Sequence, residues 1–208
     1  MLTEHQKKIL FNCLPKTIFM GDLKFQLPPV IPYCKNQTFD MRIQMTLEGF
    51  DLVTEFTKNY RFKDKELLDL TQYVRDNIEN KIDYKALPIQ HITIDELKKQ
   101  YKKEDIILRH YNELTNKRID FKFTDIFKDI PKYKITQNFY SYKNGEIVFE
   151  KVKGVESELR HGYTIHSVQG STFRNNIYIY LNGCEDNRMF YTAISRARYH
   201  NQIYLIYN

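Results

Sequence analysis

Hydrophobic and polar positions in the last third of the chain predict two buried strands with a helix between them. Residues 177–181 and 203–207 are almost all aliphatic or aromatic, which is typical of parallel strands that helices cover on both faces. From Phe190 to Ala197, apolar residues recur at helical spacing and form a single stripe. The pattern therefore predicts a strand–helix–strand unit in an open parallel sheet.

Upstream, similar patterns predict further helices and strands in alternation. Asp64 precedes a helical apolar period that runs to about Glu79, and its carboxylate is suited to cap that helix. Residues 106–108 form the apolar core of another strand. Weaker patterns predict helices at 4–14, 95–101 and 111–120 and strands at 17–20 and 50–56. This alternation indicates an α/β fold.

Residues 129–160 change character and predict a small β insertion. The segments 132–135 and 139–142 have the composition of strands. The pair Asn144-Gly145 favours a tight hairpin turn, because these residues accept the positive φ angles that such a turn needs, and 147–149 would return as the second strand. We therefore expect a β hairpin that interrupts the α/β domain.

The overall composition supports a folded protein and leaves its partners open. Of the 208 residues, 42% are hydrophobic and 28% are charged, which is typical of a globular chain and excludes intrinsic disorder. The formal net charge of +6 permits a nucleic-acid partner without requiring one.

The cysteines and the N-terminal sequence indicate in which cellular compartment we expect the protein. Cys13, Cys34 and Cys184 are far apart and lack the spacing of metal ligands, so we expect neither a disulfide framework nor a metal site. No apolar run approaches twenty residues, and the N-terminus lacks the layout of a signal peptide. We expect a soluble intracellular protein, in the cytoplasm, the nucleus or a viral replication site, with no membrane partner.

Two polar stretches near the C-terminus carry the candidate chemistry. The first, Tyr163–Phe173, gathers hydroxyls, an imidazole, an amide and a glycine into a predicted turn between hydrophobic segments. The second, Tyr191–Arg198, begins about twenty residues later and places two arginines on a predicted short helix. Together they suit a grip on a polyanion, with an arginine directed at a phosphate.

These stretches resemble the motifs of superfamily 1 helicases. Residues Thr164–Gly170 resemble motif V, Tyr191–Ala197 resemble motif VI, and Asn59–Arg61 resemble motif IV. Gly21–Val30 resembles motif III in the form used by the Pif/RecD-like branch, with one residue more than usual between Gly-Asp and the glutamine. The four motifs occur in the family's order, and the resemblance covers essentially the whole chain.

The resemblance implies a fold and a division into domains. The fold would be a RecA-like parallel sheet with flanking helices, which is the second motor domain of a P-loop NTPase, together with a small β insertion. Residues 1–48 would be a remnant of the first RecA-like domain that carries motif III. The second RecA-like domain would comprise 49–128 and 161–208, and 129–160 would form the small barrel-like insertion.

The resemblance also implies catalytic residues. Arg61 and Arg196 would reach the phosphates of ATP and neutralise charge during phosphoryl transfer. Gln26 would couple the state of the nucleotide to the nucleic-acid strand. The alternative for both arginines is a surface or structural ion pair.

Further positions would contact the nucleotide. Gln169 and Gly170 would lie between nucleotide and strand, where glycine allows close approach of the backbone. Tyr60, beside the motif IV arginine, would also belong to the nucleotide site. Asp22 would either support a metal ion or hold its own loop.

Three residues of motif V would contact a single nucleic-acid strand. The hydroxyls of Thr164 and Ser167 and the imidazole of His166 would bond its phosphates. The alternative is a capped turn that holds the start of the following helix. Phosphate contacts do not read the sugar, so single-stranded DNA is the expected partner and RNA stays open.

The sequence lacks the other half of an ATPase site. None of its seven glycines begins a G-x-x-x-x-G-K-[ST] phosphate loop, and no hydrophobic run followed by Asp-Glu precedes motif III. Together with the resemblance, this absence leads us to expect the C-terminal motor portion of an ATP-dependent DNA helicase. The resemblance to the Pif/RecD-like branch further implies 5′ to 3′ polarity and a role in replication, recombination or repair. ATP and Mg²⁺ would bind only within a complete helicase, formed with an N-terminal half or a full-length counterpart. The alternatives are an ATPase-dead single-strand-binding protein and a decayed helicase fragment.

Overall fold

The computed structural model describes residues 60–109, 123, 126–142, 146–159, 161–181 and 186–207. The chain divides into two units, Met1–Tyr60 and Arg61–Asn208, and the described helices and strands all belong to the second. The elements predicted at 4–14, 17–20, 50–56 and 111–120 lie outside the described residues. So do the Asn144-Gly145 turn, the three cysteines, Asp22 and Gln26.

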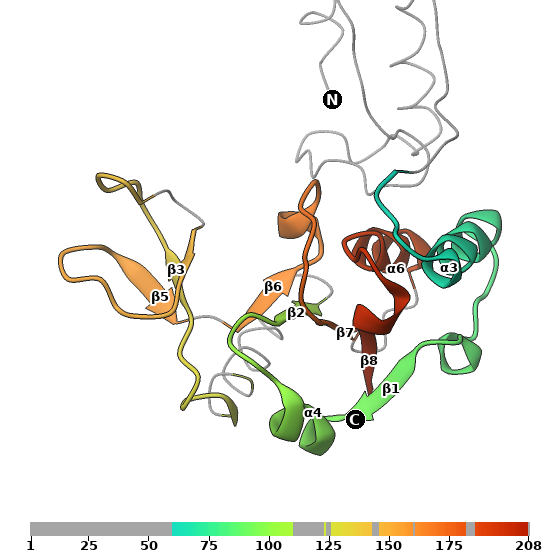
Figure 1. Cartoon of the computed structure of the whole chain (residues 1–208), viewed down its shortest axis with the longest axis horizontal. Coiled ribbons are helices and arrows are strands. Elements are labelled where there is room, and N and C mark those ends of the chain that lie inside the picture. Colours follow the sequence, from blue (N-terminus) through green and yellow to red (C-terminus); the bar gives the residue numbers. More distant parts are fainter. Residues whose placement is uncertain are drawn as a thin grey trace, which may run out of the picture. The chain divides into compact units, whose positions relative to one another are not determined.

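A five-stranded sheet forms the centre of the described unit (Figure 1). Its strands run parallel in the order β1-β8-β7-β2-β6. Their bounds are β1 Gln90–Thr93, β2 Ile106–Arg109, β6 Gly162–Thr164, β7 Ile177–Tyr180 and β8 Ile203–Tyr207. The predicted strands at 106–108, 177–181 and 203–207 are thus confirmed, and their parallel pairing agrees with the predicted α/β class.

Strand β7 shows why these sequences are hydrophobic at every position. All four of its residues are buried. Tyr178 and Tyr180 belong to a core cluster with Leu97 of α4 (Ile94–Gln100), so the alternation of side chains places Ile177 and Ile179 on the opposite face. A central strand of a parallel sheet is covered on both faces, and it therefore needs apolar side chains on both.

The remaining helices follow from local capping. Helix α3 (Lys65–Asp76) begins after Asp64, whose carboxylate accepts from the amide of Leu67 over 2.8 Å, so the predicted cap is confirmed. Helix α4 begins with a reciprocal Thr93–Glu96 capping box. Short 3₁₀ turns complete the unit at η1 (Tyr84–Ala86), η2 (His166–Val168) and η3 (His200–Gln202).

Helix α6 (Asn187–Ile194) crosses between β7 and β8 and packs beside α3 (Figure 1). It ends earlier than the apolar stripe predicted, because Ser195 is already its C-cap. Arg196 and Arg198 therefore follow the helix and do not lie on it, which corrects the expected helix at 191–198. This end places Arg196 in the connection to η3.

The β insertion exists, but its pairing differs from the expected hairpin. Its three-stranded antiparallel sheet has the order β4-β3-β5, with β3 at Tyr133–Ile135, β4 at Ile147–Val148 and β5 at Ser157–Leu159. Strand β4 pairs with β3 and not with 139–142. Residues 139–142 instead form a tight turn, in which the backbones of Phe139 and Tyr142 exchange two hydrogen bonds.

Candidate functional site

Ser195, at the end of α6, is the meeting point of the two motif arginines. Nη1 of Arg61 donates to the carbonyl oxygen of Ser195 over 2.9 Å, and Nη2 of Arg196 donates to its hydroxyl oxygen over 2.7 Å. The same hydroxyl donates to the carbonyl of Thr192 over 2.9 Å. One serine therefore fixes two guanidinium groups from segments far apart in the sequence.

The side chain of Arg196 is completely buried and held on three sides. Besides the contact with Ser195, its Nε donates to the carbonyl of Thr192 over 2.9 Å and its Nη1 donates to the carbonyl of Ser171 over 3.2 Å. Ser171 follows the motif V stretch directly. We name the group Arg61, Ser171, Ser195 and Arg196 the Ser195 junction.

Hydrogen bonds other than those of the arginine side chains also hold the segments of the Ser195 junction together. The amide of Phe173 donates to the carbonyl of Arg196 over 2.9 Å, and the amide of Lys63 donates to the carbonyl of Arg198 over 2.8 Å. The carboxylate of Asp64 accepts from the amide of His200 over 2.6 Å. The segments that follow the motif IV and motif V stretches are thus joined to the end of the motif VI stretch, independently of the arginine side chains.

The expected strand-contacting residues lie at the carboxyl end of β6. Thr164 is the last residue of this strand and is half-buried, and the η2 turn begins at His166. The Thr164 hydroxyl accepts from the amide of Ser167 over 3.3 Å, while the Ser167 hydroxyl donates to the Thr164 carbonyl over 2.8 Å. These two hydrogen bonds close the turn after β6 locally. The hydroxyl proton of Thr164 is not used in these contacts, and it can still be donated to a phosphate.

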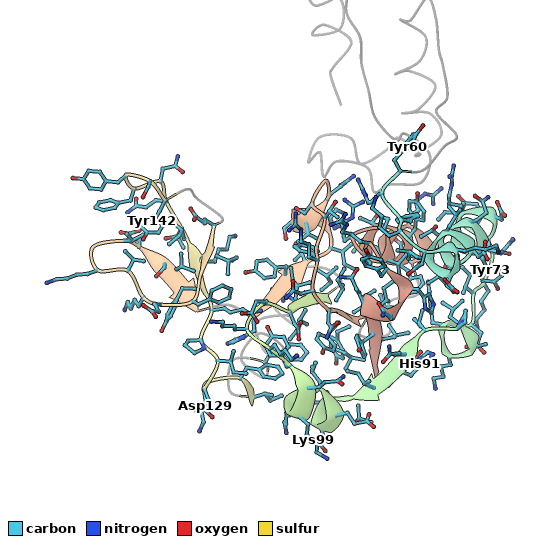
Figure 2. All side chains as sticks on the ribbon, in the orientation of Figure 1. Tyr60, Tyr73, His91, Lys99, Asp129 and Tyr142 are labelled. Atoms are coloured by element: carbon cyan, nitrogen blue, oxygen red, sulfur yellow. The ribbon has the colours of Figure 1, made fainter. Side chains whose placement is uncertain are left out.

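The other expected contact residues differ in exposure. Gln169 and Gly170 are exposed, and Gly170 has φ +90°, a backbone conformation that favours glycine. Tyr60, labelled in Figure 2, is 74% exposed. Arg196, in contrast, has no exposed surface. The structure thus gathers Arg61 and Arg196 at one residue and leaves Gln169, Gly170 and Tyr60 open to solvent.

Arg109 is a candidate that the sequence interpretation missed. It ends β2, lies opposite Thr164 in the register of β6, and is 1% exposed. Its carbonyl accepts from the amide of Ile165 over 3.0 Å, so the turn that follows Thr164 is tied to the end of β2. The sequence alone could have pointed to Arg109, because it is a charged residue at the end of an otherwise apolar strand. In such sheets, ligand-binding groups gather at the carboxyl ends of the strands.

A second polar cluster lies where the β insertion joins the main sheet. Lys132 precedes β3, His161 precedes β6, and both are buried. Nζ of Lys132 donates to the hydroxyl of Tyr101 over 2.7 Å and to the carbonyl of Asp105. We name these four residues the insertion-base cluster.

Burial determines the protonation of the insertion-base cluster. It lowers the pKa of the Lys132 ammonium to about 8, against the opposing effect of the Asp105 carboxylate. Burial, together with the charge of Lys132, lowers the pKa of the His161 imidazole to about 4. Neither ring nitrogen of His161 has a hydrogen-bond partner among the described residues. His161 is therefore a neutral, buried imidazole at neutral pH.

The described residues contain neither a metal-binding group nor a membrane-spanning helix. No group of three or more His, Cys, Asp or Glu side chains within them is arranged to hold a metal ion. No helix in this part of the chain is both long enough and apolar enough to cross a membrane.

Comparison with known proteins gives matches in structure and not in sequence. No family model matches the chain, and no curated protein matches it. A Pif1 helicase from Bacteroides, in complex with ADP-AlF3 and single-stranded DNA, matches with a TM-score of 0.53 at 17% identity, over 87% of this chain and 60% of that one. A structure of two coordinating Pif1 helicases at forked double-stranded DNA matches with a TM-score of 0.51 at 16% identity, over 87% and 58%.

The chain has the fold of the Pif1 helicases. Its parallel sheet with flanking helices is RecA-like, so the predicted fold class is confirmed. The chain spans less than two thirds of each of these two Pif1 helicase chains. At 16% and 17% identity the likeness concerns the fold, and the roles of individual residues stay predictions.

Proposed function

We propose that this chain is the C-terminal motor portion of a Pif-like, ATP-dependent DNA helicase. In this proposal it grips single-stranded DNA with Thr164, His166 and Ser167 and supplies Arg61 and Arg196 to the phosphates of ATP. Motif III would lie in 1–48, the second RecA-like domain would comprise 49–128 and 161–208, and 129–160 would be the insertion. The 5′ to 3′ polarity and a role in replication or repair belong to the same proposal.

The convergence of Arg61 and Arg196 on Ser195 is the observation that carries the proposal. Phosphoryl transfer depends mainly on positioning and on neutralising the charge of the phosphate, and planar guanidinium groups suit both tasks. Within the Ser195 junction, both guanidinium groups donate to serine and threonine oxygens, which place them side by side.

The described residues fit ATP in part. Two guanidinium groups can neutralise phosphate charge, but Arg196 would first have to exchange an oxygen that it now bonds, such as the carbonyl of Ser171, for a phosphate oxygen. The sequence has no phosphate loop to hold the β- and γ-phosphates. ATP and Mg²⁺ would therefore bind in combination with an N-terminal helicase half, with Gln26, Asp22, Tyr60, Gln169 and Gly170 on the nucleotide side.

Strand binding is the part of the proposal that the chain can be tested for by itself. We expect fluorescence anisotropy to detect binding of a single-stranded oligonucleotide, with an affinity that falls steeply as salt rises, because phosphate contacts release counterions. Replacing Thr164 and His166 together by alanine should weaken binding by roughly tenfold or more, since each loses a hydrogen bond to a charged phosphate. Thr172→Ala, at an exposed position of the same stretch, is the matched control and should bind like the original chain.

The results can contradict the proposal in two ways. Equal affinities for the original chain and the Thr164/His166 double variant would remove those contacts from it. Strand-stimulated, Mg²⁺-dependent ATP hydrolysis by the 208-residue chain alone would contradict the need for a separate phosphate-loop half.

A single-strand-binding protein without ATPase activity is the second candidate. The complete burial of Arg196 favours it, because a guanidinium that already bonds three protein oxygens has less to offer a nucleotide. Mixing the chain with the phosphate-loop half of a Pif-like helicase separates the two candidates. Restored ATP hydrolysis that is lost in Arg196→Ala favours the motor portion, and strand binding without any restored hydrolysis favours the second candidate.

A further inference from the structure

The β insertion carries an exposed aromatic turn that the proposed function does not use. In the turn Phe139–Tyr142, Tyr140 is 95% exposed and Phe139 is 36% exposed. The two rings meet edge to face, with centroids 4.7 Å apart and an interplanar angle of 85°. Figure 2 shows the labelled Tyr142 in the insertion, close to aromatic rings that extend into solvent. Such full exposure of a large aromatic ring forfeits the burial that normally stabilises it.

The backbone of this turn is held in a conformation that tyrosine rarely adopts. Tyr140 has φ +50°, and it is the non-glycine residue with positive φ in the described part of the chain. Asparagine and glycine are common in this region, whereas a bulky residue is an outlier. Backbone strain of this kind concentrates at ligand-binding sites, where the position of the side chain matters more than local stability.

The surrounding residues hold the turn in place. Two backbone hydrogen bonds of 3.0 and 2.9 Å between Phe139 and Tyr142 close it. Gly154 has φ +82°, and a Cβ atom there would lie 4.0 Å from the tip of the Phe139 ring, so a second turn runs against this ring. The Tyr140 ring therefore projects from a hydrogen-bonded turn that a neighbouring segment supports.

The chemistry of the turn selects one class of partner. The segment 136–142 contains aromatic, hydroxyl and amide side chains and no charged residue, within a chain of net charge +6. A protein partner would ordinarily bury an apolar patch or a groove, whereas a protruding ring that is 95% exposed suits stacking against another flat ring. The bases of a nucleic-acid strand provide such rings, and the basic chain attracts their backbone.

We propose that the aromatic turn Phe139–Tyr142 is a stacking platform on which Tyr140 holds an unpaired base of a single nucleic-acid strand. This inference rests on the proposed function, since it extends the path of the strand beyond Thr164 and His166. It adds a contact that depends on ring stacking and not on phosphate charge.

The test compares single-stranded oligonucleotide binding by the full chain and by Tyr140→Asn, at several salt concentrations. Asparagine accepts the positive φ of the turn, so the variant should fold and be at least as stable to heat as the original chain. Loss of the ring should weaken binding by about tenfold, the scale of one stacked base. The slope of affinity against salt should not change, because no phosphate contact is lost.

Two further variants isolate the ring. Tyr140→Phe keeps the ring without its hydroxyl and should bind like the original chain. Tyr73→Ala removes a tyrosine that is 48% exposed on α3, away from the insertion, and should leave the affinity unchanged.

The possible results are distinct. Unchanged affinity in Tyr140→Asn, alongside weakened binding in the Thr164/His166 double variant, overturns the platform and leaves the proposed function intact. No binding by the original chain overturns both. The chain could also self-associate, and Tyr140→Asn could abolish this association without changing the affinity for the oligonucleotide. That result would assign the turn to contact with a second copy of the chain and would also overturn the platform.

Discussion

Nη1 of Arg61 donates a hydrogen bond of 2.9 Å to the main-chain carbonyl of Ser195, 134 positions further along the chain. The acceptor lies at the C-cap of α6, where the last carbonyls of a helix have no partner within the helix. Arg61 therefore completes the end of α6 and at the same time is held beside Arg196. This contact links local helix capping to the placement of two candidate catalytic side chains.

We expect Arg61→Ala to lower the free energy of unfolding by about 1–2 kcal/mol, because a part-buried carbonyl loses a charged donor. Urea unfolding followed by circular dichroism would measure the change. Lys63→Ala is the matched control, since Lys63 is exposed and contributes its backbone amide to the same region. Equal stability of the two variants would mean that the Arg61 contact contributes nothing measurable.

Asn187 provides a second test of how α6 is attached. Its side-chain amide donates to three main-chain carbonyls in the segment 77–80, over 2.6 to 3.1 Å, and its oxygen accepts from the hydroxyl of Tyr84 over 2.6 Å. Asn187→Asp would set a carboxylate against those carbonyls. We expect a loss of roughly 3 kcal/mol in the free energy of unfolding, because a buried, charged carboxylate oxygen would face three carbonyl acceptors in place of the amide that donated to them.

Asn187→Ala should cost less than Asn187→Asp, since it removes the donor without adding a charge. Asn201→Asp, at an exposed position of η3, makes the same chemical change in solvent and should have little effect. Chemical unfolding of the three variants gives the order. A smaller loss for Asn187→Asp than for Asn187→Ala would contradict the hydrogen-bond directions described above.

The lowered pKa of His161 predicts that the free energy of unfolding depends on pH. Its pKa falls from the ordinary 6.5 to about 4 in the folded chain, because of burial and the nearby Lys132 charge. Between these two values the unfolded chain binds a proton that the folded chain does not, so the free energy of unfolding falls as the pH falls. From pH 6.5 to pH 5 the loss from this residue should be roughly 1–2 kcal/mol.

His161→Phe isolates this contribution. The imidazole lies among the rings of Tyr101 and Phe127, with centroids 6.3 and 5.7 Å away, so a phenyl ring suits the same surroundings. The variant should lose less stability than the original chain between pH 6.5 and pH 5, as measured by thermal or urea unfolding. Parallel pH profiles for the two proteins would show that His161 does not titrate in this way.

Sequence patterns predicted the elements whose hydrophobic signal is strongest. Strands β2, β7 and β8 are nearly all apolar, and Asp64 is a favourable cap, so these could be found without a structure. Strands β1 and β6 gave no such signal. Strand β1 lies at a sheet edge with one buried residue, Ile92, and β6 is three residues long.

Less of the candidate site could be predicted from such sequence patterns. The resemblance supplied Arg61 and Arg196, but their meeting at Ser195 depends on how α3 and α6 pack. The apolar stripe extended the predicted helix past Ser195, because Ala197 is buried although it lies beyond the helix end. Hydrophobicity reports burial, and it does not distinguish a buried helical turn from the buried connection after it.

The order of strands in the main sheet also has a consequence for synthesis on the ribosome. Strand β8 lies between β1 and β7, so β1 has no hydrogen-bonded neighbour in the described sheet until residues 203–207 have been made. The segment around Asp64 likewise bonds to His200. Translation must therefore pass residues 203–207 before β1 can join this sheet, and a stop codon just before them would delete an interior strand.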